Sequence, residues 1–276
     1  MVDHSFFSLN VSHVCRRFRN VALRTPHLWT RLDGNVNLSS TYLSRSGNLD
    51  LEIFFPYSSS SWRDVGMYFN IFKVHSDRWS HLRLDYPPYD LFPRLETLAS
   101  LPRLRFLECL SATSEVGPID MPSLVHFKGS TARPPQSPLV TCELNLHMTF
   151  DSAKLVSTLY ELKNLRHLSI SFDKLSTQSR IEDVPIYQPK APLQSLCLSS
   201  KDPTPSRFIP RICAILPFHP IAKFIVTVTR NCLNDLWMND DGGTIRRPDM
   251  GPSYYRTMDI ICTPPSVAPQ KLRRAL

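Results

Sequence analysis

The stretch LRHLSI at residues 165–170 carries apolar side chains at its first, fourth and sixth positions. The same apolar-x-x-apolar-x-apolar spacing occurs in seven segments of the chain, which start 15 to 28 residues apart. The segments are Trp79/Leu82/Leu84, Leu104/Leu107/Cys109, Leu124/Phe127/Gly129, Leu139/Cys142/Leu144, Leu165/Leu168/Ile170, Leu193/Leu196/Leu198 and Ile221/Phe224/Val226. Because the fourth and sixth positions alternate with polar neighbours, each segment is predicted to form a half-buried β-strand.

A strand of this kind buries only two or three side chains, so it needs neighbours to complete a core. Leu-x-x-Leu-x-Leu cores that recur with a period in the twenties are typical of leucine-rich repeats. Helical stretches are predicted between some of the strands, at residues 153–162 and 207–216. We therefore expect an α/β fold, an irregular leucine-rich-repeat-like solenoid (a horseshoe). The alternative is that these are ordinary amphipathic strands of another α/β fold.

The side chains between the core positions of each strand are predicted to face solvent, because successive residues of a strand point to opposite faces. In a solenoid this face is the one that binds a partner. The predicted target-binding residues are Arg83, Arg105, Glu108, Arg166, Ser169 and Gln194.

The N-terminal region reads as a series of short helices. An apolar stripe from Val11 through Phe18 to Ala22 predicts one helix that ends near Arg24, with Phe18 facing inward. Pro26 suits the first position of a second, short helix. A third helix is expected at residues 39–46, with Gly47 as its left-handed stop.

Residues 11–32, VSHVCRRFRNVALRTPHLWTRL, resemble the second half of the F-box of fungal, basidiomycete-type F-box proteins. That family shows a Cys-Arg-x-Trp/Phe-Arg core on one helix and Pro-x-Leu-Trp at the start of the next. The matching residues here are Cys15, Arg16, Phe18, Arg19, Pro26, Leu28 and Trp29. The segments LSSTYLSRSGNLDLEI (38–53) and HSDRWSHLRL (75–84) are similar to those that join the F-box to leucine-rich repeats in the family.

The resemblance implies a substrate-receptor subunit of an SCF (cullin–RING) ubiquitin ligase. Its F-box helices would dock on a Skp-type adaptor, and its repeats would hold an unknown target protein. The residues that carry over as F-box core or adaptor-facing positions are Val14, Cys15, Phe18, Pro26, Leu28 and Trp29. Residues 1–10 are too few for the family's first F-box helix, so an F-box truncated at its N-terminus is expected. The alternative is a stand-alone leucine-rich-repeat scaffold without ligase docking.

Three parts are predicted along the chain. Residues 1–47 form the partial F-box-like helical segment, and residues 48–238 form the leucine-rich-repeat-like solenoid. After Trp237 the pattern dissolves into Asp-Asp-Gly-Gly and scattered Pro and Arg. Residues 239–276 are therefore expected to be a poorly ordered C-terminal tail.

The sequence shows none of the common catalytic or cofactor-binding motifs. There is no Gly-x-Ser-x-Gly, His-Glu-x-x-His, Walker-type loop or Gly-x-Gly-x-x-Gly, and only 8 glycines against 24 prolines. The closest histidines, His75 and His81, are six residues apart across a predicted helix–strand junction, which suits a metal poorly. We therefore expect a protein that is not an enzyme and that has no cofactor or metal.

Charge and cysteine usage bear on the binding partners and the cellular compartment of the protein. The net charge of +8 is scattered along the chain, which favours a solvated basic surface over nucleic-acid binding. The seven cysteines include no Cys-x-x-Cys, which predicts reduced, buried thiols in the cytoplasm and/or the nucleus. No stretch approaches the roughly 18 apolar residues of a membrane-spanning helix, so no membrane partner is expected.

Overall fold

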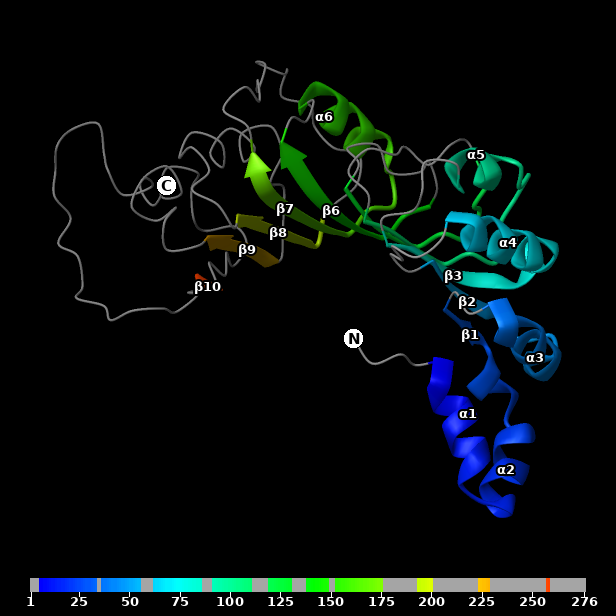
Figure 1. The fold of residues 1–276 in the computed structure, drawn as a ribbon. Helices are drawn as coiled ribbons and strands as arrows, with labels where there is room; N and C mark the ends of the chain where they lie inside the picture. The colour runs from blue at the N-terminus through cyan, green and yellow to red at the C-terminus, as the bar shows by residue number, and fades with distance from the viewer. Residues whose placement is uncertain are drawn as a thin grey trace, which may run out of the picture. The chain divides into compact units, whose positions relative to one another are not determined.

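The computed structural model describes residues 5–33, 36–55, 62–85, 91–110, 119–130, 138–148, 152–175, 193–200, 223–228 and 257–258. The chain forms two compact units, which we call the first unit (Met1–Gly129) and the second unit (Ser130–Leu276). Both contain parallel strands with intervening helices (Figure 1). The predicted α/β class is confirmed.

The first unit begins with helices and continues as a sheet. Its helices are α1 (Ser5–Val14), α2 (Arg16–Leu23), η1 (Pro26–Trp29), α3 (Val36–Ser46), α4 (Trp62–Phe72), η2 (Lys73–Arg78) and α5 (Leu91–Glu96). Its strands are β1 (Arg31–Leu32), β2 (Leu51–Phe55), β3 (Trp79–Leu84), β4 (Phe106–Cys109) and β5 (His126–Gly129). The strands lie side by side in sequence order, and every pair is parallel.

The core of the first unit is built from rows of side chains that run across the strands. One row is fully in register across the strands and consists of Leu32, Ile53 and the fourth positions of three segments, Leu82, Leu107 and Phe127. All five side chains are buried. Helix α4 covers this face, because the Tyr68 ring contacts Phe55 edge-on at 5.0 Å and the Phe69 ring contacts Trp79 at 6.5 Å (Figure 1).

The second unit repeats this plan. It contains β6 (Thr141–Met148), α6 (Ser152–Glu161), β7 (His167–Leu175), β8 (Ser195–Ser200) and β9 (Lys223–Val228), with the four strands parallel and in sequence order. A fifth strand, β10 (Thr257–Met258), pairs antiparallel with β9. The buried rows are Cys142, Leu168 and Leu196, then Leu144, Ile170 and Leu198.

The two units use the same turn before a strand. The backbone N–H groups of Leu104, Leu124 and Leu165 each donate to the carbonyl three residues earlier, at 3.1, 3.1 and 3.3 Å. Each of these leucines is the first position of a segment, and each is buried. The turn therefore fixes where the next strand begins.

The two units also share one link between neighbouring strands. The carbonyl oxygen of Arg105 accepts hydrogen bonds from the N–H groups of Val125 and His126, both at 3.0 Å. In the second unit the Arg166 carbonyl accepts from Gln194 and Ser195 at 2.7 and 3.0 Å. The segments are thus equivalent in hydrogen bonding as well as in sequence.

The prediction of one continuous helix from Val11 to Arg24 is wrong. Cys15 has an extended backbone (φ −159°, ψ 169°) and separates α1 from α2, which pack against each other. Arg19 on α2 donates from Nε to the Ser12 carbonyl of α1 at 3.0 Å and so satisfies the end of α1. Phe18 is consequently 52% exposed rather than facing inward, because the apolar spacing was counted across a chain reversal.

Other local predictions are confirmed. Pro26 begins the short helix η1, and Gly47 follows α3 with a positive φ of 58°. The helix predicted at residues 153–162 is α6.

The remaining predictions about the fold concern residues that lie partly or wholly outside the described ranges. The helix predicted at residues 207–216 and the start of the last segment at Ile221 lie outside them. So does the tail at residues 239–276 apart from β10, and the division at residues 47 and 238 stays a prediction.

Candidate functional site

The outward face of the first unit carries a line of three rings, the aromatic strip, made by His81, Phe106 and His126. These residues occupy the third position of three consecutive segments and are in register across β3, β4 and β5. The His81 ring stacks on Phe106 with centroids 4.2 Å apart and planes 7° apart. The His126 ring lies 5.6 Å from Phe106 at 37°.

Phe106 is 40% exposed, so the strip presents apolar surface to solvent although it lies in an ordered sheet. The pKa of His81 is lowered, chiefly because burial disfavours the charged imidazolium. Glu52 and Asp50 oppose this shift, whereas Arg105 and His126 add to it. The His81 ring is therefore held toward its neutral form, which suits stacking on Phe106.

A second outward row, the charge ladder, runs beside the strip through the fifth positions Arg83, Glu108 and Lys128. Glu108 accepts from both neighbours, with Oε2 3.4 Å from Arg83 Nη1 and Oε1 2.9 Å from Lys128 Nζ. Arg83 Nε also donates to Asp85 Oδ1 at 2.9 Å, and this bond raises the pKa of the Arg83 guanidinium. These charges offset one another within the sheet.

Arg105 differs from these paired residues. It is exposed, and its charge is felt at His81, so it lies beside the aromatic strip. Within the described ranges, its guanidinium has no hydrogen-bond or ion-pair partner. Arg105 therefore places an exposed cation, without an ion-pair partner among the described residues, beside the aromatic strip.

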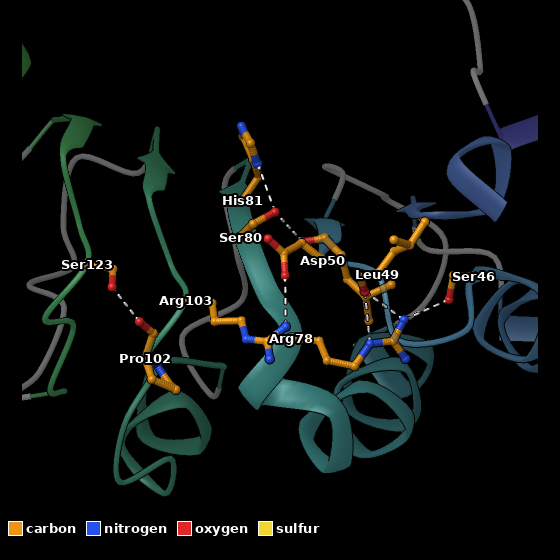
Figure 2. A network of polar contacts seen from close by, with 10 residues as sticks. Ser46, Leu49, Asp50, Arg78, Ser80, His81, Pro102, Arg103 and Ser123 are labelled. Carbon is orange, nitrogen blue, oxygen red and sulfur yellow. Dashed lines mark hydrogen bonds and ion pairs between the residues drawn. The ribbon is translucent and has the colours of Figure 1, made fainter.

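A polar network holds the start of β3 and so positions the strip (Figure 2). The buried Arg78 donates from Nε and Nη2 to the Leu49 carbonyl at 2.9 and 2.8 Å, and from Nη2 to Ser46 Oγ at 2.9 Å. Burial lowers the pKa of this guanidinium. Ser80 Oγ donates to the Leu51 carbonyl at 3.1 Å and lies 3.1 Å from His81 Nδ1.

The outward face of the second unit is different in chemistry. Its third-position row is Thr141, His167 and Ser195, and its fifth-position row is Glu143, Ser169 and Cys197. His167 Nδ1 lies 2.8 Å from Ser195 Oγ. From β6 to β8 these two rows contain no Phe, Tyr or Trp and no lysine or arginine, and on β9 they continue with Lys223 and Ile225.

Four exposed apolar side chains lie on the N-terminal helices, and we call this set the helical patch. Val14, Phe18, Val21 and Leu23 are 67%, 52%, 56% and 44% exposed. The exposed arginines of the same segment are Arg16, Arg17, Arg19 and Arg24. Apolar side chains surrounded by basic ones are typical of a surface that binds another protein.

The predicted adaptor-binding residues do not share one environment. Val14, Cys15, Phe18 and Pro26 are exposed, Leu28 is half-buried and Trp29 is fully buried. Trp29 donates from Nε1 to the Ala22 carbonyl at 2.8 Å, and its ring meets Tyr42 edge-on at 5.1 Å. Trp29 thus holds the helices of the first unit together.

The predicted target-binding residues divide between the two units. Arg83, Arg105 and Glu108 belong to the first, and Arg166, Ser169 and Gln194 belong to the second. The aromatic strip was not among the predictions. A large apolar residue at an outward position, Phe106, was the signal that could have found it.

The four cysteines in the described ranges differ in exposure, and Cys197 is half-buried. Cys109 and Cys142 are buried, as predicted, and burial raises the pKa of the Cys142 thiol. Cys15 is exposed, which corrects the expectation for this residue because it lies at the reversal between α1 and α2.

Comparison with protein-family models, curated proteins and solved structures gives no match for this chain. Among the residues that the structure describes, no three His, Cys, Asp or Glu side chains come together as a metal site. Across the same ranges, no helix combines the length and apolar character that a membrane crossing requires.

Proposed function

We propose that this chain is a protein-binding substrate receptor of an SCF ubiquitin ligase, active in the cytoplasm and/or the nucleus. The helical patch would dock on a Skp-type adaptor, and the strands would form an irregular leucine-rich-repeat-like solenoid that holds the target. The observation that carries the proposal is the exposed apolar surface of α1 and α2, beside a sheet whose outward rows are also rich in binding chemistry.

The chemistry of the helical patch specifies what would cover it. Burying Val14, Phe18, Val21 and Leu23 removes apolar surface from water, at roughly 25 cal/mol per Å². Arg16 and Arg17 on α2 favour acidic groups at the rim of the partner and repel basic ones. The expected adaptor surface is therefore apolar at its centre and acidic at its edge.

Co-expression of the chain with a Skp-type adaptor, followed by co-purification, tests this proposal. Phe18→Asp should reduce the recovered adaptor at least tenfold, because a carboxylate would be buried at the interface without a partner. Val74→Asp is the matched control, since Val74 on η2 is 69% exposed and outside the patch. Equal recovery with Phe18→Asp and with the wild-type chain would contradict adaptor docking through α2.

One observation favours the second candidate, a stand-alone scaffold without ligase docking. Trp29, which the family resemblance would place either in the F-box core or facing the adaptor, is fully buried in the first unit and offers no side chain to a partner. A wild-type chain that recovers no adaptor, while folding cooperatively, would establish this second function.

A further inference from the structure

The aromatic strip and Arg105 form a surface whose chemistry is more specific than the rest of the sheet. Its three rings come from three neighbouring parallel strands, about 4.8 Å apart. The strip is therefore about 10 Å long, which matches roughly three residues of an extended chain. A short peptide segment could lie along it.

The rings favour an apolar or aromatic side chain as their ligand. Phe106 is 40% exposed, although burying it would be favourable. The imidazoles on both sides occupy its edges but leave part of the ring open, since His126 is tilted by 37°. Another ring packed against Phe106 would gain an aromatic contact as well as burial.

The charges around the strip favour a carboxylate beside that ring. The carboxylates of Asp85 and Glu108 are bound by Arg83 and Lys128, and Asp50 is bound by Arg103 at 3.1 Å. Glu52 is in register beside Arg31. Among the described residues, Arg31 and Arg105 form no ion pair, and the Arg31 guanidinium lies over the Phe54 ring, 4.1 Å from its centroid. Arg105 is exposed and is therefore the cation open to an added carboxylate.

The same features disfavour a nucleic acid. Aromatic rings with an arginine can stack on bases, but such surfaces also need a basic groove for the phosphates. Here the cations of the charge ladder, Arg83 and Lys128, are already paired with Asp85 and Glu108, so the described part of this face presents no continuous basic groove. Because most charges on this face are paired, a peptide with a single negative charge suits it better than a nucleic acid with many phosphates.

We propose that the aromatic strip and Arg105 bind a short extended peptide in which an aromatic side chain is followed closely by Asp or Glu. This inference rests on the proposed function, because it describes the target that the repeat domain would hold. Phe106 would contact the aromatic side chain, and Arg105 would pair with the carboxylate. The imidazoles of His81 and His126 would hold the Phe106 ring in place.

The test is selection of a random 12-residue peptide library on the immobilised full chain, followed by sequencing. Peptides with Phe, Tyr or Trp within three residues of Asp or Glu should be enriched at least tenfold over the input. Phe106→Ala should abolish the aromatic preference, and Arg105→Glu should replace the acidic preference by Lys or Arg. Val74→Ala, at an exposed site on η2, should leave the enrichment unchanged.

Enrichment without this aromatic–acidic pairing would overturn the inference, as would the same peptides selected by Phe106→Ala. Tighter binding of a single-stranded poly-uridine probe than of the selected peptides would also overturn it. Adaptor recovery with these variants separates the two proposals, because neither substitution touches the helical patch. If the chain recovers the adaptor but enriches no peptide, only the peptide inference is contradicted. If it enriches the expected peptides but recovers no adaptor, only adaptor docking is contradicted.

Discussion

The two units have the same buried rows and different outward rows. In both, the fourth and sixth positions of the segments from Trp79 to Leu198 are buried in the core, and the same turn and carbonyl link recur. In the first unit the outward rows hold stacked rings and paired charges, whereas in the second, from β6 to β8, they hold three hydroxyl groups, a histidine, a glutamate and a cysteine. The core and the outward surface therefore use alternate residues of the same strands.

The sixth position gives the strongest test of this separation, because its buried side chains shrink across the first unit. The row runs Leu84, Cys109, Gly129, and a Cβ at Gly129 would lie 2.5 Å from Phe127 Cζ. Gly129→Val should therefore lower the free energy of unfolding by about 3 kcal/mol through overpacking. Urea denaturation followed by tryptophan fluorescence measures this loss.

The matched change in the second unit is Ile170→Val, where the row stays large and the cost should be only about 1 kcal/mol. If Phe127 is the obstacle, Phe127→Leu should reduce the cost of Gly129→Val, as a double-mutant cycle would show. Equal losses from Gly129→Val and Ile170→Val would contradict the size gradient.

Arg78 is a second feature of the first unit whose removal should be costly. Arg78→Met would remove three hydrogen bonds and leave the Leu49 carbonyl without its guanidinium donor, at a cost of about 2–3 kcal/mol. Arg103→Met should cost less than about 1 kcal/mol, because Arg103 and Asp50 form an exposed ion pair. The melting temperatures of both variants show whether the contribution of an arginine to stability depends on its burial or only on its ion pair.

The pH dependence of stability should reveal the aromatic strip. Because burial lowers the pKa of His81 below 6.5 in the folded chain, the unfolded chain binds more protons between that lowered pKa and 6.5. Stability should rise with pH through this window and fall as the medium becomes more acidic. His81→Phe keeps a ring stacked on Phe106 but removes the titrating imidazole. The slope of the unfolding free energy against pH should therefore fall by the equivalent of up to one proton. Urea titrations from pH 5 to pH 7.5 measure this slope.

The outward hydroxyl groups of the second unit should contribute least to the free energy of unfolding. Ser169→Ala should change the free energy of unfolding by less than about 0.5 kcal/mol, since Ser169 lies on the outward face and not in the core. Glu108→Ala in the first unit should cost more, about 1 kcal/mol, because Arg83 and Lys128 would both lose their shared carboxylate. Parallel urea titrations of these two variants compare the faces directly.

The strands were predictable because their signal is local. Apolar residues two positions apart define the buried side of a strand, and Gly47 and Pro26 mark turns through their own backbone preferences. The break at Cys15 was not predictable, because the apolar spacing continues across it and only the packing of α1 on α2 reverses the chain. The strip was missed since ring stacking depends on register between strands.

The carbonyl groups that each accept two N–H groups from the next strand bear on how the strands tolerate substitution. At Arg105 and Arg166 one strand is tied to the next through backbone atoms, in addition to the side-chain contacts between the strands. Because these links do not depend on side-chain identity, substitutions at the outward positions would leave this part of the register in place.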